Sequence, residues 1–487
     1  MSEIEIKLEV DPGARAGVAL AFAQAHATRL RLQAIYWDTP DGRLAAHGIA
    51  LRVRREGRRW VQTVKAAGDS SLHRLEHNVA LVVAGSPDAP AADPSRHADT
   101  PVGQRLIALL EGAPAIEPRY ATDVLRRALR IAVDGAAVEV AFDEGVVRAG
   151  ERHTPVCEVE VESLHGDLAL LFDIARRGIA EHGLRIGSVS KSARGERLHQ
   201  SVAHGLPVKA GAPALTTVMN LDAALRCTVA TCVAQILANA DEVAAGSPDP
   251  DHVHQLRVGL RRLRTALREL GSASPAVDPA WEPRLAHTFR ELGVLRDHEV
   301  LAATVVPRLI DAGAPALAAL VPVSQAREPR ALVRDPAVQQ TLVDLVEFSM
   351  GEPQSEAPAA RKALNAILRG LHRKLARRAK RFESLPEAQQ HAVRKLLKRL
   401  RYVAEFARSL HDPKKVLRYL DRLEPAQEAL GRHNDEAMAL ALYRRAAEGG
   451  DANAWFAVGW LQGRQAAGAA QCARRLRQVA DAPRFFD

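Results

Sequence analysis

Acidic side chains stand at every second position near the start of the chain, at Glu3 and Glu5, and again at Glu158, Glu160 and Glu162. In a β-strand, side chains two residues apart point to the same face, so each set predicts a row of carboxylates. In the later row no basic residue separates the carboxylates, and they repel one another unless a cation binds. Because hard divalent ions prefer carboxylate oxygens, the two rows predict a site for Mg²⁺ or Mn²⁺.

Basic side chains follow the same alternation on other expected strands, at Arg52, Arg54, Lys65, Arg74 and Arg126. The forked guanidinium group of arginine suits phosphate oxygens. An ordinary sheet with one solvated face would explain any single strand of this kind. Charges that are segregated by strand instead favour a sheet closed around a polar interior, which would hold a metal ion and a polyphosphate-like anion.

Later in the chain, basic side chains recur at helical spacing. His254, Arg257, Arg261 and Arg264 follow at intervals of three or four residues, which places them on one stripe of a helix. The pattern returns 137 residues further on as His391, Arg394, Lys398 and Arg401, and the neighbouring Arg262 recurs as Arg399. A basic stripe is commonly just a solvated face, but a repeated stripe with few acidic partners favours a surface for a polyanion.

Two kinds of secondary structure would position these groups. Period-two alternation predicts an antiparallel sheet with strands at Glu3–Val10, Ala50–Glu56, Trp60–Lys65, Leu72–Leu81, Val138–Asp143 and Cys157–Ser163. Helices are expected near Arg15–Leu32, Val102–Leu110 and Leu168–His182, and from Leu215 onward the pattern is almost wholly helical. The sequence therefore predicts a multidomain α+β protein with a first domain at 1–205, a linker at 206–214 and an all-α domain of two pseudo-symmetric bundles at 215–487.

Charge and composition narrow the choice of partners. The 487 residues carry a net charge of +9, and because residues 1–210 hold 27 basic and 27 acidic side chains, the whole excess lies in the helical part. Aromatic residues make up only 4%, which disfavours nucleic acid recognised by base stacking. The four cysteines form no CxxC pair, and no apolar run approaches a span of ~18 residues. We expect a cytoplasmic protein that does not bind membranes.

The first half resembles the CYTH family, the triphosphate tunnel metalloenzymes. The resemblance rests on Glu3-Ile4-Glu5-Ile6-Lys7, Arg52, Arg54, Lys65, Arg74, Glu76, Arg126, Asp143, the triplet Glu158, Glu160 and Glu162, and Lys191 in the segment SKSARG. Asn78 departs from the pattern, since many members have a second carboxylate there. The resemblance implies a closed antiparallel eight-stranded β tunnel with flanking helices that binds a triphosphate chain together with a divalent metal ion.

The resemblance also implies roles for single residues. The expected metal ligands are Glu3, Glu5, Glu158, Glu160 and Glu162, and the expected substrate contacts are Lys7, Arg52, Arg54, Lys65, Arg74, Arg126 and Lys191. Glu3, Glu5, Lys7 and Glu160 are expected to take part in catalysis. Asp143 is left open between supporting an arginine and touching the metal through water. Tyr36 and Asp38 are expected in a turn or lid.

The helical half resembles the CHAD domain. The matching residues are His254, Arg257, Arg261, Arg262 and Arg264 and their counterparts His391, Arg394, Lys398, Arg399 and Arg401. This resemblance implies two antiparallel helical bundles around a basic groove or pore that binds inorganic polyphosphate through these ten side chains. His372 and His433 are weaker candidates for the same surface.

The combined prediction is a metal-dependent inorganic triphosphatase that hydrolyses tripolyphosphate and carries a polyphosphate-binding domain. A nucleoside- or thiamine-triphosphate hydrolase, or a class IV type adenylyl cyclase, is the alternative among enzymes. Outside enzymes, the alternative is a non-catalytic protein that binds polyphosphate or is targeted to polyphosphate granules, and the enzyme itself could also associate with such granules. The sequence leaves the preferred metal and the oligomeric state open.

Overall fold

The computed structural model describes residues 2–68, 72–82, 89–316 and 327–487. The chain divides into two compact units, each built from several stretches of sequence. The first comprises Met1–Val208, Leu237–His252 and Val333–Glu347, and the second comprises Lys209–Ile236, Val253–Leu332 and Phe348–Asp487. Two stretches of the helical half therefore belong to the first unit. The predicted domain boundaries at residues 205 and 215 stay a prediction.

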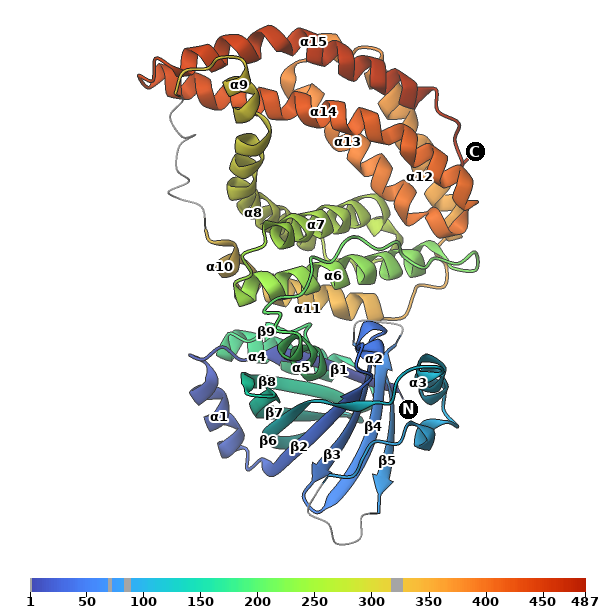
Figure 1. Cartoon of the computed structure of the whole chain (residues 1–487). Helices are drawn as coiled ribbons and strands as arrows, with labels where there is room; N and C mark the ends of the chain where they lie inside the picture. Colours follow the sequence, from blue (N-terminus) through green and yellow to red (C-terminus); the bar gives the residue numbers. More distant parts are fainter. Residues whose placement is uncertain (1, 69–71, 83–88, 317–326) are drawn as a thin grey trace. The chain divides into compact units, whose positions relative to one another are not determined.

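The first unit contains a closed antiparallel barrel (Figure 1). Its strands are β1 Ser2–Glu9, β2 Thr28–Asp38, β3 Ile49–Glu56, β4 Arg59–Ala67, β5 His73–Leu81, β6 Glu117–Val133, β7 Ala136–Ala149 and β8 Arg152–His165, with a short β9 at Arg185–Ile186. They pair in the order β5-β4-β3-β2-β6-β7-β8-β1, and β1 also pairs with β5, which closes the ring of eight strands. The expected eight-stranded barrel is confirmed, and all six predicted strands lie within it.

Helices accompany the barrel: α1 Arg15–Gln24, α2 Arg43–Ala46, the 3₁₀ turn η1 Pro94–His97, α3 Pro101–Leu110, α4 Ala169–His182 and α5 Lys191–His199. The predicted helices at 102–110 and 168–182 are confirmed as α3 and α4. The helix predicted from Arg15 to Leu32 is wrong in its second part, because α1 ends at Gln24 and β2 begins at Thr28. His26 lies between them with φ 53°, a left-handed turn that an uninterrupted helix does not contain.

The barrel interior has an apolar half and a charged half. Tyr36 lies opposite Tyr120 and opposite Arg52, so all three side chains share the inner face. The apolar half is a buried cluster of Ala34, Tyr36, Tyr120, Val124, Val147, Ala149 and Val156, against which Leu198 of α5 packs. Gly195 permits this contact, since a Cβ atom there would lie only 2.0 Å from Tyr120. Helix α5 thereby fills one half of the barrel and carries Lys191 toward the other.

Of the two residues near the end of β2 that were expected in a turn or lid, only Asp38 lies at a turn. Tyr36 is not in a lid but within the strand, only 4% exposed, with its ring stacked on Tyr120 at 4.8 Å between centroids. Asp38 does stand at a turn, where its carboxylate accepts backbone hydrogen bonds from Thr39, Leu44 and Ala45. These bonds satisfy amide groups at the start of α2, so the residue supports the local fold.

The remaining helices are α6 Leu221–Ala245, α7 Pro250–Leu270, α8 Trp281–Thr304, α9 Val306–Asp311, α10 Pro329–Val333, α11 Pro336–Met350, α12 Ala360–Ala379, α13 Glu387–Phe406, α14 Pro413–Glu448 and α15 Ala454–Ala480, with 3₁₀ turns at Gly271–Ala273, Phe382–Ser384 and Arg408–Leu410. The predicted helical character of this half is confirmed. Within the second unit, one core cluster joins α8, α9, α14 and α15 through Leu301, Val305, Leu309, Ala439, Tyr443, Ala447, Ala454, Ala457, Val458 and Leu461. The repeated basic stripes lie on α7 and α13.

Helix α6 is long and apolar enough to cross a membrane by length and composition alone. Its most apolar stretch is 67% buried within the protein, and a helix in a protein core passes the same test. The sequence analysis expected no apolar segment of this length, so that expectation is wrong for α6. Because the helix is mostly buried, it is weak evidence for a membrane span.

Candidate active site and candidate polyanion surface

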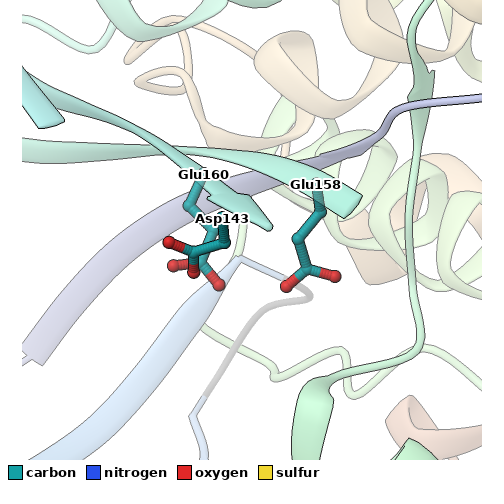
Figure 2. A group of neighbouring side chains, drawn as sticks. All are labelled: Asp143, Glu158 and Glu160. Carbon is teal, nitrogen blue, oxygen red and sulfur yellow. The ribbon is translucent and has the colours of Figure 1, made fainter. Parts of the chain in front are cut away.

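Three carboxylates converge on the inner wall where β7 pairs with β8. Asp143 lies opposite Glu158, and Glu160 follows two positions further along β8. Ligand oxygens of the three residues all lie within 4.8 Å of one another, and Figure 2 shows the side chains gathered in one place. Asp143 and Glu158 are fully buried. Burying several carboxylates together is costly, so this acidic cluster requires positive charge close by.

Lys191 and Arg126 supply positive charge to the acidic cluster. The Lys191 ammonium lies 2.6 Å from Asp143 Oδ2, 2.6 Å from Glu158 Oε1 and 2.8 Å from Glu160 Oε1. Arg126 donates from Nε to Asp143 Oδ1 at 2.8 Å and also pairs with Glu160. Burial alone would raise the pKa of Glu160, but the charges of Lys191 and Arg126 outweigh burial and hold that pKa well below its ordinary value. The carboxylate is therefore ionised, as a metal ligand must be.

A second acidic group, formed by Glu3, Glu5, Glu76 and Glu162, lies on β1, β5 and β8. Lys65 Nζ lies 2.8 Å from Glu3 Oε2 and 2.5 Å from Glu76 Oε2, while Glu5 stands opposite Glu162. Burial raises the pKa of Glu3 to about 9, and a hydrogen bond with Glu76 acts in the same direction. Burial also raises the pKa values of Glu5 and Glu162, and the charge of Glu160 raises that of Glu5 further, although the charge of Lys65 opposes burial in each case. An added cation would favour the ionised forms of these carboxyl groups.

Both acidic groups offer hard oxygen ligands that fit Mg²⁺ or Mn²⁺. The predicted metal ligands are spread over both groups: Glu158 and Glu160 stand with Asp143, and Glu3 pairs with Glu76 through Lys65. Glu5 stands opposite Glu162, but the charges of Glu160 and Lys191 also act on it, so it lies between the two groups. Asp143 pairs with Arg126, which is one of the two roles that the sequence left open, and it also belongs to a carboxylate cluster. Its contact with a metal through water stays a prediction. Asn78 donates to Glu76 Oε1 at 2.7 Å, so it orients that carboxylate and does not add another.

Arg52, Arg54 and Arg126 share the inner face of β3 and β6. Arg52 Nη1 donates to the Tyr36 hydroxyl group at 3.4 Å, and Arg54 Nε donates to Glu56 Oε1 at 2.7 Å. Burial lowers the pKa of Arg54, and the charges of Arg52 and Arg126 lower it further. Phosphate oxygens would relieve this repulsion through charge-assisted hydrogen bonds. The inner wall thus combines sites suited to cations with a site suited to an anion.

The other predicted cations lie around the two acidic groups. Lys7 Nζ lies 2.9 Å from Glu9 Oε1 and 3.6 Å from Glu158 Oε2. Arg74 stands opposite Glu3 in the β1–β5 register. Arg194 was not predicted from the sequence, yet its Nη2 lies 2.9 Å from Glu158 Oε2. It follows Lys191 by three residues on α5, and this helical spacing was the signal available in SKSARG.

In the second unit, three arginines of α7 surround one aromatic ring of α8. The guanidinium carbons of Arg257, Arg261 and Arg264 lie 4.8, 5.1 and 5.6 Å from the centroid of Phe289. An aromatic face attracts cations, so Phe289 helps to hold like charges together. Arg257 additionally donates to the Leu292 carbonyl oxygen at 2.9 Å.

Lys398 of α13 joins these arginines. Burial lowers its pKa to about 6, the charges of Arg261, Arg394 and Arg257 act in the same direction, and the charge of Asp435 opposes them. We call Arg257, Arg261, Arg394 and Lys398 the cationic cluster. It combines residues from both repeated stripes within the second unit, as a shared polyanion surface requires.

Several other predicted members of the basic surface have carboxylate partners or lie inside the fold. Arg264 donates to Glu282 at 3.0 Å, Arg399 to Glu269 at 2.9 Å and Arg401 to Glu405 at 2.8 Å. Arg262, which was predicted to contact polyphosphate, lies inside the fold. It is 1% exposed, donates to the Gly211 carbonyl oxygen at 2.6 Å and lies 5.4 Å from the Phe406 ring centroid. Because Arg262 directly follows Arg261, its side chain is turned about 100° around the helix axis, toward the core.

The histidines also differ among themselves. His254 is exposed on α7, and His391 Nδ1 lies 2.6 Å from Asn434 Oδ1. His372 and His433 are buried, with ring nitrogens 2.9 Å from the Tyr419 hydroxyl oxygen and 2.7 Å from Gln390 Oε1 respectively. These two side chains belong to the interior of the helical part and not to a basic surface.

The sequence matches the CYTH domain family over residues 1–195 and the CHAD domain family over residues 227–444. This chain is a CYTH domain followed by a CHAD domain. An inorganic triphosphatase of Haemophilus influenzae is 31% identical over 207 residues, which cover 40% of this chain and 54% of that protein. The CYTH–CHAD chain thus spans about half the length of this relative.

Two solved structures are among those similar to this chain. The CHAD domain from the plant Ricinus communis is 29% identical, with 57% of this chain and 98% of that chain covered and a TM-score of 0.48. A putative adenylyl cyclase from Hippeastrum, described as having a dominant triphosphatase activity, is 17% identical, with 42% of this chain and 98% of that chain covered and a TM-score of 0.28.

Proposed function

We propose that this protein is a metal-dependent triphosphatase that releases phosphate from inorganic tripolyphosphate inside the CYTH barrel. The observation that carries the proposal is the presence of two acidic groups together with Arg52, Arg54 and Arg126 on one inner wall. Such a wall accommodates divalent cations and a phosphate chain side by side. The similarity to the Haemophilus influenzae inorganic triphosphatase supports the same class of reaction.

Phosphoryl transfer requires that the substrate is bound and oriented and that its negative charge is neutralised, and different residues of the barrel would serve each purpose. Arg52, Arg54 and Arg126 bind the non-bridging oxygens and orient the phosphate chain, which lowers the entropic part of the barrier. Lys191 neutralises negative charge beside the acidic cluster. A divalent cation, when held by the carboxylates, would stabilise charge on the transferred phosphoryl group and lower the pKa of a bound water.

A panel of substrates tests this proposal. Phosphate release would be measured from tripolyphosphate, long-chain polyphosphate, ATP and thiamine triphosphate, each with Mg²⁺ or Mn²⁺. We expect the highest kcat/KM with tripolyphosphate. A preference for ATP or thiamine triphosphate would favour the other hydrolases, and a cyclic nucleotide with pyrophosphate as products would favour the cyclase. No turnover with any pair of substrate and metal would contradict an enzymatic role.

The CHAD domain, in the same proposal, binds inorganic polyphosphate. The cationic cluster supports this role, because burial and the neighbouring arginines outweigh the charge of Asp435 and disfavour the ammonium form of Lys398, which a further anion would stabilise. A phosphate chain can contact several cluster members at once, so a long chain should bind more tightly than tripolyphosphate. The affinity should also fall steeply with added salt, as counterion release predicts for polyanions.

Titration of the full chain, without divalent metal, against long-chain polyphosphate and duplex DNA at two salt concentrations tests the binding proposal. Reversing both Arg257→Glu and Arg394→Glu should weaken polyphosphate binding more than either change alone and leave tripolyphosphate hydrolysis unchanged. The matched control is Arg474→Glu, an exposed arginine of α15 outside the cluster. Tighter binding to DNA, or an unaffected double variant, would overturn the proposed ligand.

A further inference from the structure

The segment that leads into Lys191 is held by a carboxylate from the helical half of the sequence. Residues 187–190 connect β9 to α5, and Lys191 is the first residue of that helix. Asp241 of α6 accepts hydrogen bonds from Ser188 N at 2.8 Å, from Ser188 Oγ at 3.0 Å and from Val189 N at 3.1 Å. All of these residues belong to the first compact unit.

Asp241 is suited to fix the backbone of this segment. Its side chain is 6% exposed and pairs with Arg185 of β9. Burial alone would raise the pKa of Asp241, but the charges of Arg185 and Lys7 outweigh burial and lower that pKa. An ionised carboxylate accepts stronger hydrogen bonds from backbone amides than a neutral group does. Two consecutive amides, those of Ser188 and Val189, are thereby restrained directly before α5 begins.

The same segment also touches Lys7, one of the predicted substrate contacts. The Lys7 ammonium donates to the Val189 carbonyl oxygen, and Gly187 N donates to the Lys7 carbonyl oxygen at 2.8 Å. A Cβ atom at Gly187 would lie 2.8 Å from Lys7 Cε and 2.7 Å from Glu9 Oε1. Residues 187–190 are therefore held by Asp241 and by β1 together.

We infer that Asp241 is a positioning residue of the barrel site: it fixes residues 187–190 so that the Lys191 ammonium reaches Asp143, Glu158 and Glu160. The inference rests on the proposed triphosphatase function and adds to it a residue from outside the CYTH match, which ends at residue 195. It also explains what Leu237–His252, which belongs to the same compact unit as the barrel, contributes to that unit.

Variants of the full chain test this role. Asp241→Asn keeps one carbonyl oxygen as an acceptor but removes the charge, and Asp241→Ala removes every contact. The matched control is Asp344→Asn, which breaks an ion pair with Arg176 of 2.9 Å in the same unit and away from residues 187–190. We expect a fall of about tenfold or more in kcat/KM with tripolyphosphate for Asp241→Asn, as for loss of a charge-assisted contact, and less than about twofold for the control.

A double variant that combines Asp241→Asn with Lys191→Ala shows whether Asp241 positions Lys191 or only stabilises the folded protein. If Asp241 acts through Lys191, the double variant Asp241→Asn/Lys191→Ala should lose less activity than the product of the two single losses. Losses that simply multiply, at a temperature where all variants are folded, would overturn the inference.

Amide hydrogen exchange gives a readout that does not depend on turnover. Exchange at residues 187–191 should be faster in Asp241→Asn than in the wild type or in Asp344→Asn, because the restrained amides are released. Unchanged exchange there would overturn the inference even if activity fell. If the wild type hydrolyses no triphosphate, the proposed function fails, while the exchange experiment still decides whether Asp241 holds this segment.

Discussion

Binding of polyphosphate to the CHAD domain should draw a proton onto Lys398. In the free protein, burial and the neighbouring arginines lower the pKa of Lys398 to about 6. At pH 7.5 only about 3% of this side chain is then charged, from the Henderson–Hasselbalch relation. A bound phosphate chain adds negative charge to that of Asp435 and favours the ammonium form. If the pKa returns to its ordinary value of 10.5, each bound chain takes up about one proton at this site.

The direction of the pH dependence follows from this uptake. Because the complex holds more protons than the free protein, binding strengthens as pH falls. Between about pH 9 and pH 6.5 the affinity should rise by about tenfold for each pH unit, which corresponds to ~1.4 kcal/mol. Below pH 6, where free Lys398 is already protonated, the dependence due to this residue should flatten.

Calorimetric titration of the full chain with long-chain polyphosphate, at pH 7.5 in two buffers of different ionisation enthalpy, measures the protons taken up. Lys398→Met should reduce the uptake by about one proton, as the linkage argument requires. Lys395→Met is the matched control, since Lys395 is exposed on the same helix, and its uptake should equal that of the wild type. No uptake by the wild type, or equal uptake by Lys398→Met, would refute the reasoning.

Three further predictions concern the CYTH barrel. Glu160→Gln should abolish metal-dependent phosphate release and leave the fold intact, and near wild-type turnover at limiting metal would contradict the metal-site assignment. Arg52→Ala and Arg54→Ala each remove charge-assisted hydrogen bonds worth about 1.5–3 kcal/mol, so kcat/KM should fall tenfold or more; unchanged values would place both arginines outside the substrate path. Burial lowers the pKa of His97, whose Nε2 lies 2.9 Å from Gln62 Nε2, to about 4. Since the unfolded state binds the proton more readily, stability should decrease by roughly 2–3 kcal/mol from pH 7 to pH 4.5, and urea unfolding of wild type and His97→Gln would show whether this loss depends on the imidazole.

The features that follow a local period were predictable from the sequence. Alternation of Glu3 and Glu5 with apolar residues indicated a strand, and the same rule for Glu158 and Glu160 placed their side chains on one face. The 137-residue repeat located the helix of Arg257 and its counterpart. Period and spacing determine which face a side chain occupies, and this was sufficient to anticipate a charged barrel interior.

Features that depend on contacts far apart in the sequence were not predictable in this way. Arg262 belongs to the repeated motif, but its burial depends on how α7 packs against Phe406 of α13. The division of the metal ligands into two groups depends on where Lys65 and Lys191 place their ammonium groups. Asp241 lies about 50 residues from the segment that it holds, and nothing local in α6 distinguishes it from an ordinary polar residue of a helix.

The filling of one half of the barrel by α5 and by apolar side chains determines how a long phosphate chain could be cut. Leu198 and the Tyr36–Tyr120 pair pack together in the apolar half, so we expect a phosphate chain to enter the interior from the charged half. In that case a terminus of the chain enters first, and we expect the cleaved phosphate to leave by the same route. For the proposed enzyme, polyphosphate would then shorten stepwise from its ends without internal scission, and the rate at equal phosphate mass would follow the number of chain ends.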